Sequence, residues 1–211
     1  MITTEQFQFF DEAYQFYNTE LFNGKLCDCI IITNKGKRFC GTFTPNRWKH
    51  KLKDGEKDIH EIALNPEYLD GPDEAWQQTL VHEMVHLWQR DFGKISRAGY
   101  HNKQFADKME EIGLMPSSTG APGGKKTGQK MSDYIIPGGA FIEAFKRLQE
   151  KKLKYATNAV LFDGSKLKKK NNSKTKYVCS CKNKVWGKPG LLLTCNSCNS
   201  FYTEIEPEED L

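Results

Sequence analysis

The segment TLVHEMVH, residues 79–86, decides how the rest of the chain is interpreted. It lies within a run from Asp73 to Phe92 whose apolar residues recur at helical spacing, which predicts one long amphipathic helix. Four residues make about one helical turn, so the imidazoles of His82 and His86 project from the same side of this helix. Both lie off its apolar half and can therefore bind one ion, with Glu83 beside the ion rather than on it.

This arrangement indicates a catalytic zinc site, in which the metal lowers the pKa of a bound water toward about 7 and Glu83 removes its proton. Such sites usually have three protein ligands. The candidates for the third ligand are His50, His60, His101, Glu110 and Glu111. His101 follows a glycine turn and starts a predicted helix over 102–112, which can bring it back against the first two histidines. From the residues alone we favour His101 over Glu110, whose sequence position suits a site of two histidines and one glutamate.

Two close pairs of cysteines near the C-terminus predict a second metal site. The ligands are Cys179, Cys181, Cys195 and Cys198, in the order Cys-x-Cys and Cys-x-x-Cys. Four thiolates joined by a hairpin form a closed, structural zinc site. A segment of about 30 residues cannot build its own core, so metal binding would supply its folding free energy. Two disulfides are the disfavoured alternative, because residues 1–10 lack the features of a secretory signal.

The other three cysteines, Cys27, Cys29 and Cys40, are expected to be free thiols, of which Cys27 and Cys29 alternate on one buried face of a strand.

The net charge of +4 conceals an uneven distribution along the 211 residues. Residues 1–145 have a net charge of −3, residues 146–188 of +12, and residues 189–211 of −5. A basic block of this density either binds nucleic-acid phosphates or serves as a solvated linker. No apolar run approaches the roughly 20 residues of a membrane span, and we expect a cytoplasmic protein, with association with the nucleoid as an option.

Helices are expected over residues 4–23, 73–92, 102–112 and 141–154, and strands over 26–33, 38–43 and 59–64. This order predicts an α+β fold with an antiparallel or mixed sheet. The expected organisation is a catalytic core over 1–115, a Gly/Ser/Pro-rich linker or loop over 116–140, a helix and basic linker over 141–175, a zinc ribbon over 176–205 and an acidic tail over 206–211.

The chain resembles the SprT-like metalloproteases, the family of bacterial SprT and the animal protease Spartan, over about residues 5–203. The resemblance is carried by residues 79–86, the segment Ile-Ala-Leu-Asn at 62–65, Gly99-Tyr100-His101 followed by Phe105, and the four-cysteine ribbon. The chain departs from the family pattern at Asn102, where the family often has glycine, and in its long linker at 116–130.

The resemblance implies a zincin-like, minigluzincin catalytic domain with zinc held by His82, His86 and His101 and with Glu83 as the general base. It implies an endopeptidase acting on proteins on or near DNA, with one catalytic and one structural Zn²⁺. Its partners would be a protein substrate and DNA, the latter bound by residues 146–188 and the ribbon, and we expect a monomer. Tyr100, Arg97 and Tyr134 are candidates for assisting the oxyanion.

The alternative hypothesis is a zinc-ribbon module that binds nucleic acid and whose histidine site is structural or vestigial. In that module Tyr177 and Trp186 could stack on bases, although both are more often packing residues of a ribbon. The presence of Glu83 favours the enzyme, because a purely structural site needs no general base.

Overall fold

The fold was analysed in a computed structural model, which describes residues 1–35, 39–53, 55–69, 73–151 and 175–205. The chain divides into two compact units, Met1–Leu161 and Phe162–Leu211. None of the helices in the described part of the chain has the length and apolar character that a membrane span requires.

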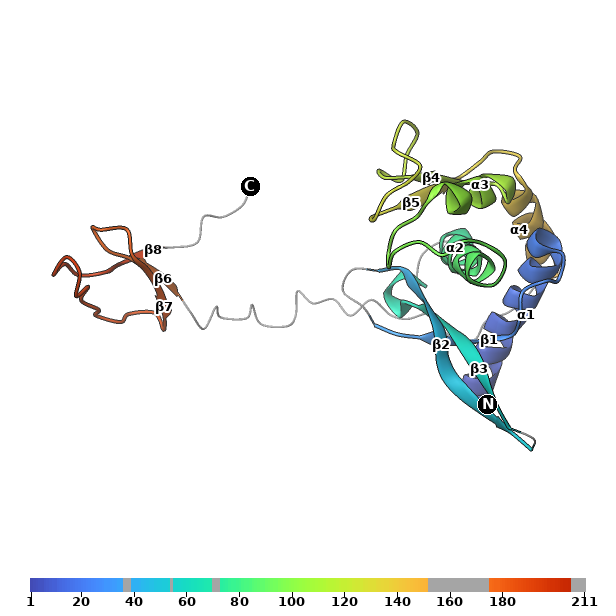
Figure 1. The fold of residues 1–211 in the computed structure, drawn as a ribbon, viewed down its shortest axis with the longest axis horizontal. Coiled ribbons are helices and arrows are strands. Elements are labelled where there is room, and N and C mark those ends of the chain that lie inside the picture. Colours follow the sequence, from blue (N-terminus) through green and yellow to red (C-terminus); the bar gives the residue numbers. More distant parts are fainter. Residues whose placement is uncertain (36–38, 54, 70–72, 152–174, 206–211) are drawn as a thin grey trace. The chain divides into compact units, whose positions relative to one another are not determined.

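The first unit combines helices with a mixed sheet (Figure 1). In the sheet, β3 (Gly55–Leu64) lies between the other two strands, parallel to β1 (Cys29–Thr33) and antiparallel to β2 (Gly41–Leu52). The α+β class with a mixed sheet is therefore confirmed. The elements are α1 (Ile2–Phe22), β1 (Cys29–Thr33), β2 (Gly41–Leu52), β3 (Gly55–Leu64), a 3₁₀ turn (Pro66–Tyr68), α2 (Asp73–Phe92), α3 (Lys103–Glu111), β4 (Leu114–Ser117), β5 (Ser132–Ile135) and α4 (Ala140–Glu150).

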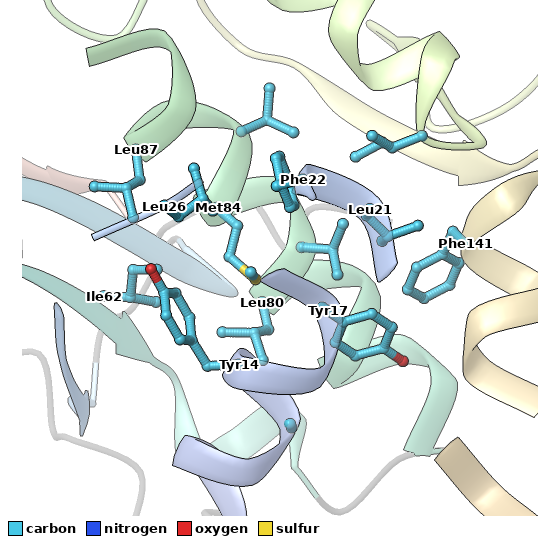
Figure 2. Close-up of a cluster of buried hydrophobic side chains, with 14 of the residues drawn as sticks. Tyr14, Tyr17, Leu21, Phe22, Leu26, Ile62, Leu80, Met84, Leu87 and Phe141 are labelled. Atoms are coloured by element: carbon cyan, nitrogen blue, oxygen red, sulfur yellow. The ribbon is translucent and has the colours of Figure 1, made fainter. Parts of the chain in front are cut away.

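Helix α2 occupies the middle of this unit and has the predicted bounds (Figure 1). Leu80 and Met84 of α2 are fully buried, and they face Tyr14 of α1 and Ile62 of β3 in the core (Figure 2). Because α2 packs against helices and against the sheet, its apolar surface is wider than the single stripe of a helix that packs on one side only. This packing fixes the opposite face of α2, which carries the two histidines.

Strands β2 and β3 are longer than predicted, because they continue to pair beyond the body of the unit (Figure 1). The pairing runs from Gly41↔Leu64 to Leu52↔Gly55, with a bulge between Thr44 and Trp48. Most residues of this outer hairpin are exposed on both faces, so they lack the alternation of apolar and polar residues by which a half-buried strand is predicted. The first helix also begins earlier than expected, with Met1 rather than Thr3 or Thr4 as its N-cap.

The segment 116–140, which we expected to be a linker or loop, is instead part of the first unit. Strands β4 and β5 form an antiparallel hairpin with Leu114 opposite Ile135 and Ser117 opposite Ser132. Backbone hydrogen bonds from Ile136 to Gly113 and from Phe141 to Ile112 tie the hairpin and α4 to the end of α3. The acidic tail at 206–211 and residues 152–174 of the expected basic segment lie outside the described residues.

In the second unit the described residues form a small antiparallel sheet in the order β7-β6-β8. Its strands are β6 (Thr175–Val178), β7 (Lys184–Gly187) and β8 (Thr203–Ile205). The turn between β6 and β7 carries Cys179 and Cys181, and the connection from β7 to β8 carries Cys195 and Cys198. The unit includes residues 176–205, over which the cysteine spacing predicted a ribbon.

Candidate metal centres

Three histidines from different parts of the first unit meet at one point. His82 and His86 lie one turn apart on α2, and His101 lies just before α3. The Nε2 atom of His101 is 3.3 Å from Nε2 of His82 and 3.1 Å from Nε2 of His86. The buried ring of Phe105 packs against all three imidazoles, with ring centroids 4.4–5.2 Å apart. The structure thus brings together the three histidines that the sequence singled out.

Hydrogen bonds at the Nδ1 atoms determine which nitrogen of two of these rings is free. Nδ1 of His82 lies 2.7 Å from the Asp133 carboxylate, and Nδ1 of His101 lies 3.3 Å from the carbonyl oxygen of Gly128. A carboxylate and a carbonyl oxygen only accept hydrogen bonds, so both Nδ1 atoms must carry the proton and donate it. In a neutral ring the Nε2 atom then carries an unshared lone pair. Two lone pairs this close repel each other unless a cation lies between them.

The spacing of these nitrogens fits a divalent metal. A tetrahedral site with metal–nitrogen bonds of about 2.0–2.1 Å separates its nitrogens by about 3.3 Å, close to the two Nε2–Nε2 distances here. The three ligand atoms all lie within 4.8 Å of one another. The donor set of three imidazoles is therefore suited to zinc or a similar transition metal.

Burial and mutual repulsion set the protonation of the histidines. Burial, with the neighbouring His82 and His101, lowers the pKa of His86 well below its usual value. Burial and His82 likewise lower the pKa of His101 to about 4. At His82, burial lowers the pKa, but the hydrogen bond and charge of Asp133 outweigh it, so that the pKa is raised. Two of the three imidazoles are thus held in the neutral form that a metal requires.

Glu83 lies at the junction of α2 and β2. Its side chain is 6% exposed and accepts a hydrogen bond from the backbone N–H of Phe43. Burial is the largest influence on its carboxyl group and raises its pKa to about 7. Gly41 makes room for it, since a Cβ at that position would lie 3.1 Å from the Glu83 carboxylate. Glu83 thus follows the first ligand histidine directly in the sequence, and its carboxylate is held by strand β2.

The other candidates for a third ligand lie elsewhere. Glu110 forms an ion pair with Lys126 at 2.8 Å, and Glu111 with Lys108 at 2.7 Å. His50 lies on the exposed outer part of β2. Of the groups named for the oxyanion, Arg97 stacks its guanidinium 4.8 Å above the ring of Tyr100. Tyr134 lies on β5, paired with Met115.

His60 belongs to a separate cluster with Cys27 and Asp91, whose ligand atoms also lie within 4.8 Å of one another. Its Nδ1 accepts a hydrogen bond of 2.9 Å from the backbone N–H of Asn46, so a neutral ring carries its proton on Nε2. The Nε2 atom lies 3.4 Å from the Oδ1 atom of Asp91, so its proton faces that carboxylate. Since Nε2 has no lone pair to offer, we interpret this cluster as a hydrogen-bonded network. Burial raises the pKa of Cys27 to about 11, which agrees with an unreactive thiol.

The four ribbon cysteines form the second cluster suited to a metal, with all four sulfurs within 4.8 Å of one another. The sulfurs of Cys181 and Cys195 are 3.7 Å apart, close to the roughly 3.8 Å that tetrahedral metal–sulfur bonds of about 2.3 Å produce. Those of Cys179 and Cys181 are 3.1 Å apart, too far for a disulfide, and all four thiols are free. The structure therefore contains neither of the two disulfides that the sequence analysis disfavoured.

The loops around the ribbon cysteines are shaped to direct N–H groups at the sulfurs. Lys182 and Asn199, one residue beyond each cysteine pair, have left-handed backbones with φ of 65° and 50°. The backbone N–H of Ser197 lowers the pKa of Cys195 to about 5, and Ser200 lowers that of Cys198. Hydrogen bonding with Cys179 raises the pKa of Cys181 to about 12. Two of the four sulfurs are thus stabilised as the thiolates that metals bind.

Sequence reasoning missed Asp133 and Gly128, which lie in the segment expected to be a linker. The side chain of Asp133 is 8% exposed. The Gln78 amide on α2 donates a hydrogen bond of 2.5 Å to the Asp133 carboxylate and one of 3.0 Å to the Asp133 backbone oxygen. Gly128 forms an isolated β-bridge with His101. No local motif marks these two residues, because their role depends on contacts 51 and 27 residues away along the chain.

A cluster of three imidazoles, of which that of His101 is buried, and a buried glutamate that directly follows the first histidine make up a candidate metal centre. In a comparison with protein families, residues 10–125 match the SprT-like family. The chain belongs to this family, whose members are generally linked to metallopeptidase-like function. Comparisons with curated proteins and with solved structures gave no match.

Proposed function

We propose that the protein is a zinc-dependent endopeptidase with a zincin-like catalytic domain, and that it acts on proteins on or near DNA. The observation that carries the proposal is the convergence of three Nε2 atoms next to the buried Glu83, which forms no ion pair with a cationic side chain among the described residues. A second zinc ion would be held by Cys179, Cys181, Cys195 and Cys198 and would have a structural role.

Zinc held by His82, His86 and His101 would supply a Lewis acid that acidifies water and polarises the substrate carbonyl. The Glu83 carboxylate then takes the proton of the attacking water and passes it to the leaving amine. Its hydrogen bond from the Phe43 N–H keeps the carboxylate oriented during both transfers. Burial removes competing water from it, which favours the transfer of a proton at a fixed position.

Strand β2 offers a surface for the substrate backbone. It is an edge strand, since within the described residues it pairs only with β3. An extended peptide can add to the unpaired side of such a strand through backbone hydrogen bonds. The part of β2 from Gly41 to Phe43 passes directly beside Glu83, so a peptide added there would present its carbonyl groups near the site.

The test of the enzymatic proposal compares wild type with Glu83→Gln on a protein substrate, both free and bound to DNA. We expect cleavage by wild type and at least a 100-fold loss in the variant, about what the loss of a general base costs, with unchanged zinc content. The control is Glu110→Gln, which removes a glutamate paired with Lys126 instead. Equal cleavage by wild type and Glu83→Gln would contradict the mechanism, whereas equal cleavage of free and bound substrate would remove the link to DNA.

One observation supports nucleic-acid binding by the ribbon. Trp186 on β7 is 61% exposed and lies opposite Lys176 on β6, so an aromatic face and a cation are adjacent on the same sheet. An exposed aromatic ring flanked by lysines can stack on a base of single-stranded DNA. Tyr177, the other aromatic considered for stacking, is buried and donates a hydrogen bond to the Lys188 carbonyl oxygen, so it is a packing residue.

The ribbon proposal is tested by the affinity of the full chain for single-stranded DNA at several salt concentrations. Trp186→Ala should cost about 1–3 kcal/mol of binding free energy with little change in the salt dependence. Lys176→Ala should reduce the salt slope by about 0.7. Leu192→Ala is the control, because Leu192 is 92% exposed but has no aromatic face. Unchanged affinity in Trp186→Ala would count against this surface.

A further inference from the structure

The two Nδ1 partners of the histidine cluster come from one short stretch of chain. Gly128 and Asp133 both lie between β4 and the end of β5, and both lie beyond residue 125, where the match to the family ends. Gly128 is held against His101 by two backbone hydrogen bonds of 2.8 and 3.1 Å in addition to its contact with Nδ1. This segment therefore contacts two of the three histidines from the side opposite to their Nε2 atoms.

Asp133 is the charged member of this arrangement, and it is itself held in place. One carboxylate oxygen lies 2.7 Å from Nδ1 of His82, and the other accepts a hydrogen bond from the Gln78 amide. The Gln78 amide also binds the backbone oxygen of Asp133, which fixes β5 to α2 one turn before His82. Gln78, Asp133 and His82 thus form a continuous chain of hydrogen bonds that leads to the cluster.

We propose that Asp133, held by Gln78, is a positioning residue of the metal centre that fixes the tautomer and orientation of His82 and strengthens its bond to the metal. The hairpin segment 114–135 is then an integral part of the catalytic domain. A carboxylate that accepts the Nδ1 proton of a ligating histidine makes its Nε2 a better donor, and losing such a partner typically weakens metal binding by about 10–100-fold. This inference rests on the proposed metal site.

Asp133→Asn is an informative substitution because it preserves the size of the side chain. An asparagine has one acceptor oxygen, whereas two donors face Asp133, the Nδ1–H of His82 and the Gln78 amide. One of these two hydrogen bonds must therefore be lost together with the negative charge. Asp107→Asn is the matched control, since Asp107 is an exposed acid on α3 that pairs with Lys103.

The experiment titrates the full-length, metal-free protein with Co²⁺ in competition with a chelator. Sulfur-to-cobalt charge-transfer absorption reports the ribbon site, and the weaker ligand-field bands of a nitrogen site report the histidines. We expect Asp133→Asn to weaken binding at the histidines by about 10–100-fold and to alter their ligand-field bands. The ribbon affinity should stay unchanged in every variant and serves as an internal control.

The outcomes separate this inference from the proposed function. If wild type binds no cobalt at the histidines, the metal site itself is refuted and the inference with it. If wild type binds and Asp133→Asn binds within about twofold of Asp107→Asn, only the role of Asp133 is overturned. Should Asp133→Asn fail to fold, as judged by circular dichroism, Gln78→Met decides: weakening of several-fold supports the inference, and unchanged affinity overturns it.

Discussion

Gly41 is a residue at which β2 passes close to α2. A Cβ built on it would lie 2.7 Å from Cγ2 of Thr79 and 3.1 Å from both Cγ and Oε1 of Glu83. Contacts this short require a neighbour to move, and the neighbours here are a residue of the central helix and the proposed general base. The absence of a side chain at Gly41 is thus what lets β2 approach Glu83 closely enough for the Phe43 N–H to bind it.

Gly41→Ala should therefore displace Glu83 and lower kcat/KM about 10-fold or more, since small displacements of a catalytic group have large effects on rate. Metal content should not change, because the three atoms nearest to the added methyl group belong to Thr79 and Glu83 and not to a histidine. The measurement is the rate of peptide cleavage together with bound zinc per chain. Adding Thr79→Ser removes the closest methyl group and should restore part of the activity. Full activity in Gly41→Ala would show that the strand can move without cost.

The individual site residues differ in how far the sequence could reveal them. His82, Glu83 and His86 were predictable because helical geometry alone fixes their relative directions. His101 was predictable only as one of several candidates, since its approach depends on the loop that follows α2. Asp133 could not be found, because a carboxylate that supports a histidine has no required spacing from it in sequence. Only the packing of β5 against α2 makes it part of the site.

At the level of the elements, the start of α3 explains why asparagine follows the third histidine. The side chain of Asn102 caps α3 by accepting from the Phe105 N–H at 3.0 Å, and it also accepts from the Gln89 amide on α2 at 2.7 Å. Its own amide donates to the Lys94 carbonyl oxygen at 3.2 Å. One side chain thus joins α2, α3 and the loop between them next to His101, which a glycine at this position could not do.

Asn102→Ala should lower the free energy of unfolding of the first unit by about 1–2 kcal/mol, the usual cost of removing an N-cap acceptor. Asn102→Asp keeps an acceptor for Phe105 and Gln89 and loses only the donation to Lys94, so it should be milder. Thermal unfolding monitored by near-ultraviolet circular dichroism measures both, and a loss of about 2–4 °C in Tm is expected for each kcal/mol. If the two variants were equally unstable, the capping interaction would not be the cause.

The elements that the sequence predicted best are those whose own residues determine them. Helix α2 has its predicted bounds because its apolar period extends over five turns without a break. The hairpin of β4 and β5 was missed because the Gly, Ser and Pro residues between them are typical of linkers. Its order comes from contacts with the rest of the unit, such as the Gly128–His101 bridge and the hydrogen bonds from the Gln78 amide to Asp133. Such contacts leave no local pattern.

Considered as a whole molecule, the chain contains two units that are stabilised in different ways. The first buries a large apolar cluster that includes Trp76, Tyr14 and Phe141. In the described residues of the second, the only buried hydrophobic residues are Tyr177, Cys179 and Cys195. Two of these three are proposed metal ligands, so the apolar surface that remains is too small to offset the conformational entropy of folding.

Removal of metal should therefore unfold the second unit and leave the first folded. A structural zinc site contributes about 10–16 kcal/mol of apparent binding free energy, far more than burial of Tyr177 alone can supply. In Cys195→Ser, or in wild type treated with a strong chelator, the amides of β6 and β7 should lose their protection from hydrogen exchange. The amides of α2 around Leu80 and Met84 should remain protected, because their stability comes from the apolar core. Cys40→Ser, which removes a thiol outside both proposed metal sites, should leave both units protected. Persistent protection of β6 in Cys195→Ser would mean that the ribbon folds without its metal and that the cysteines have another role.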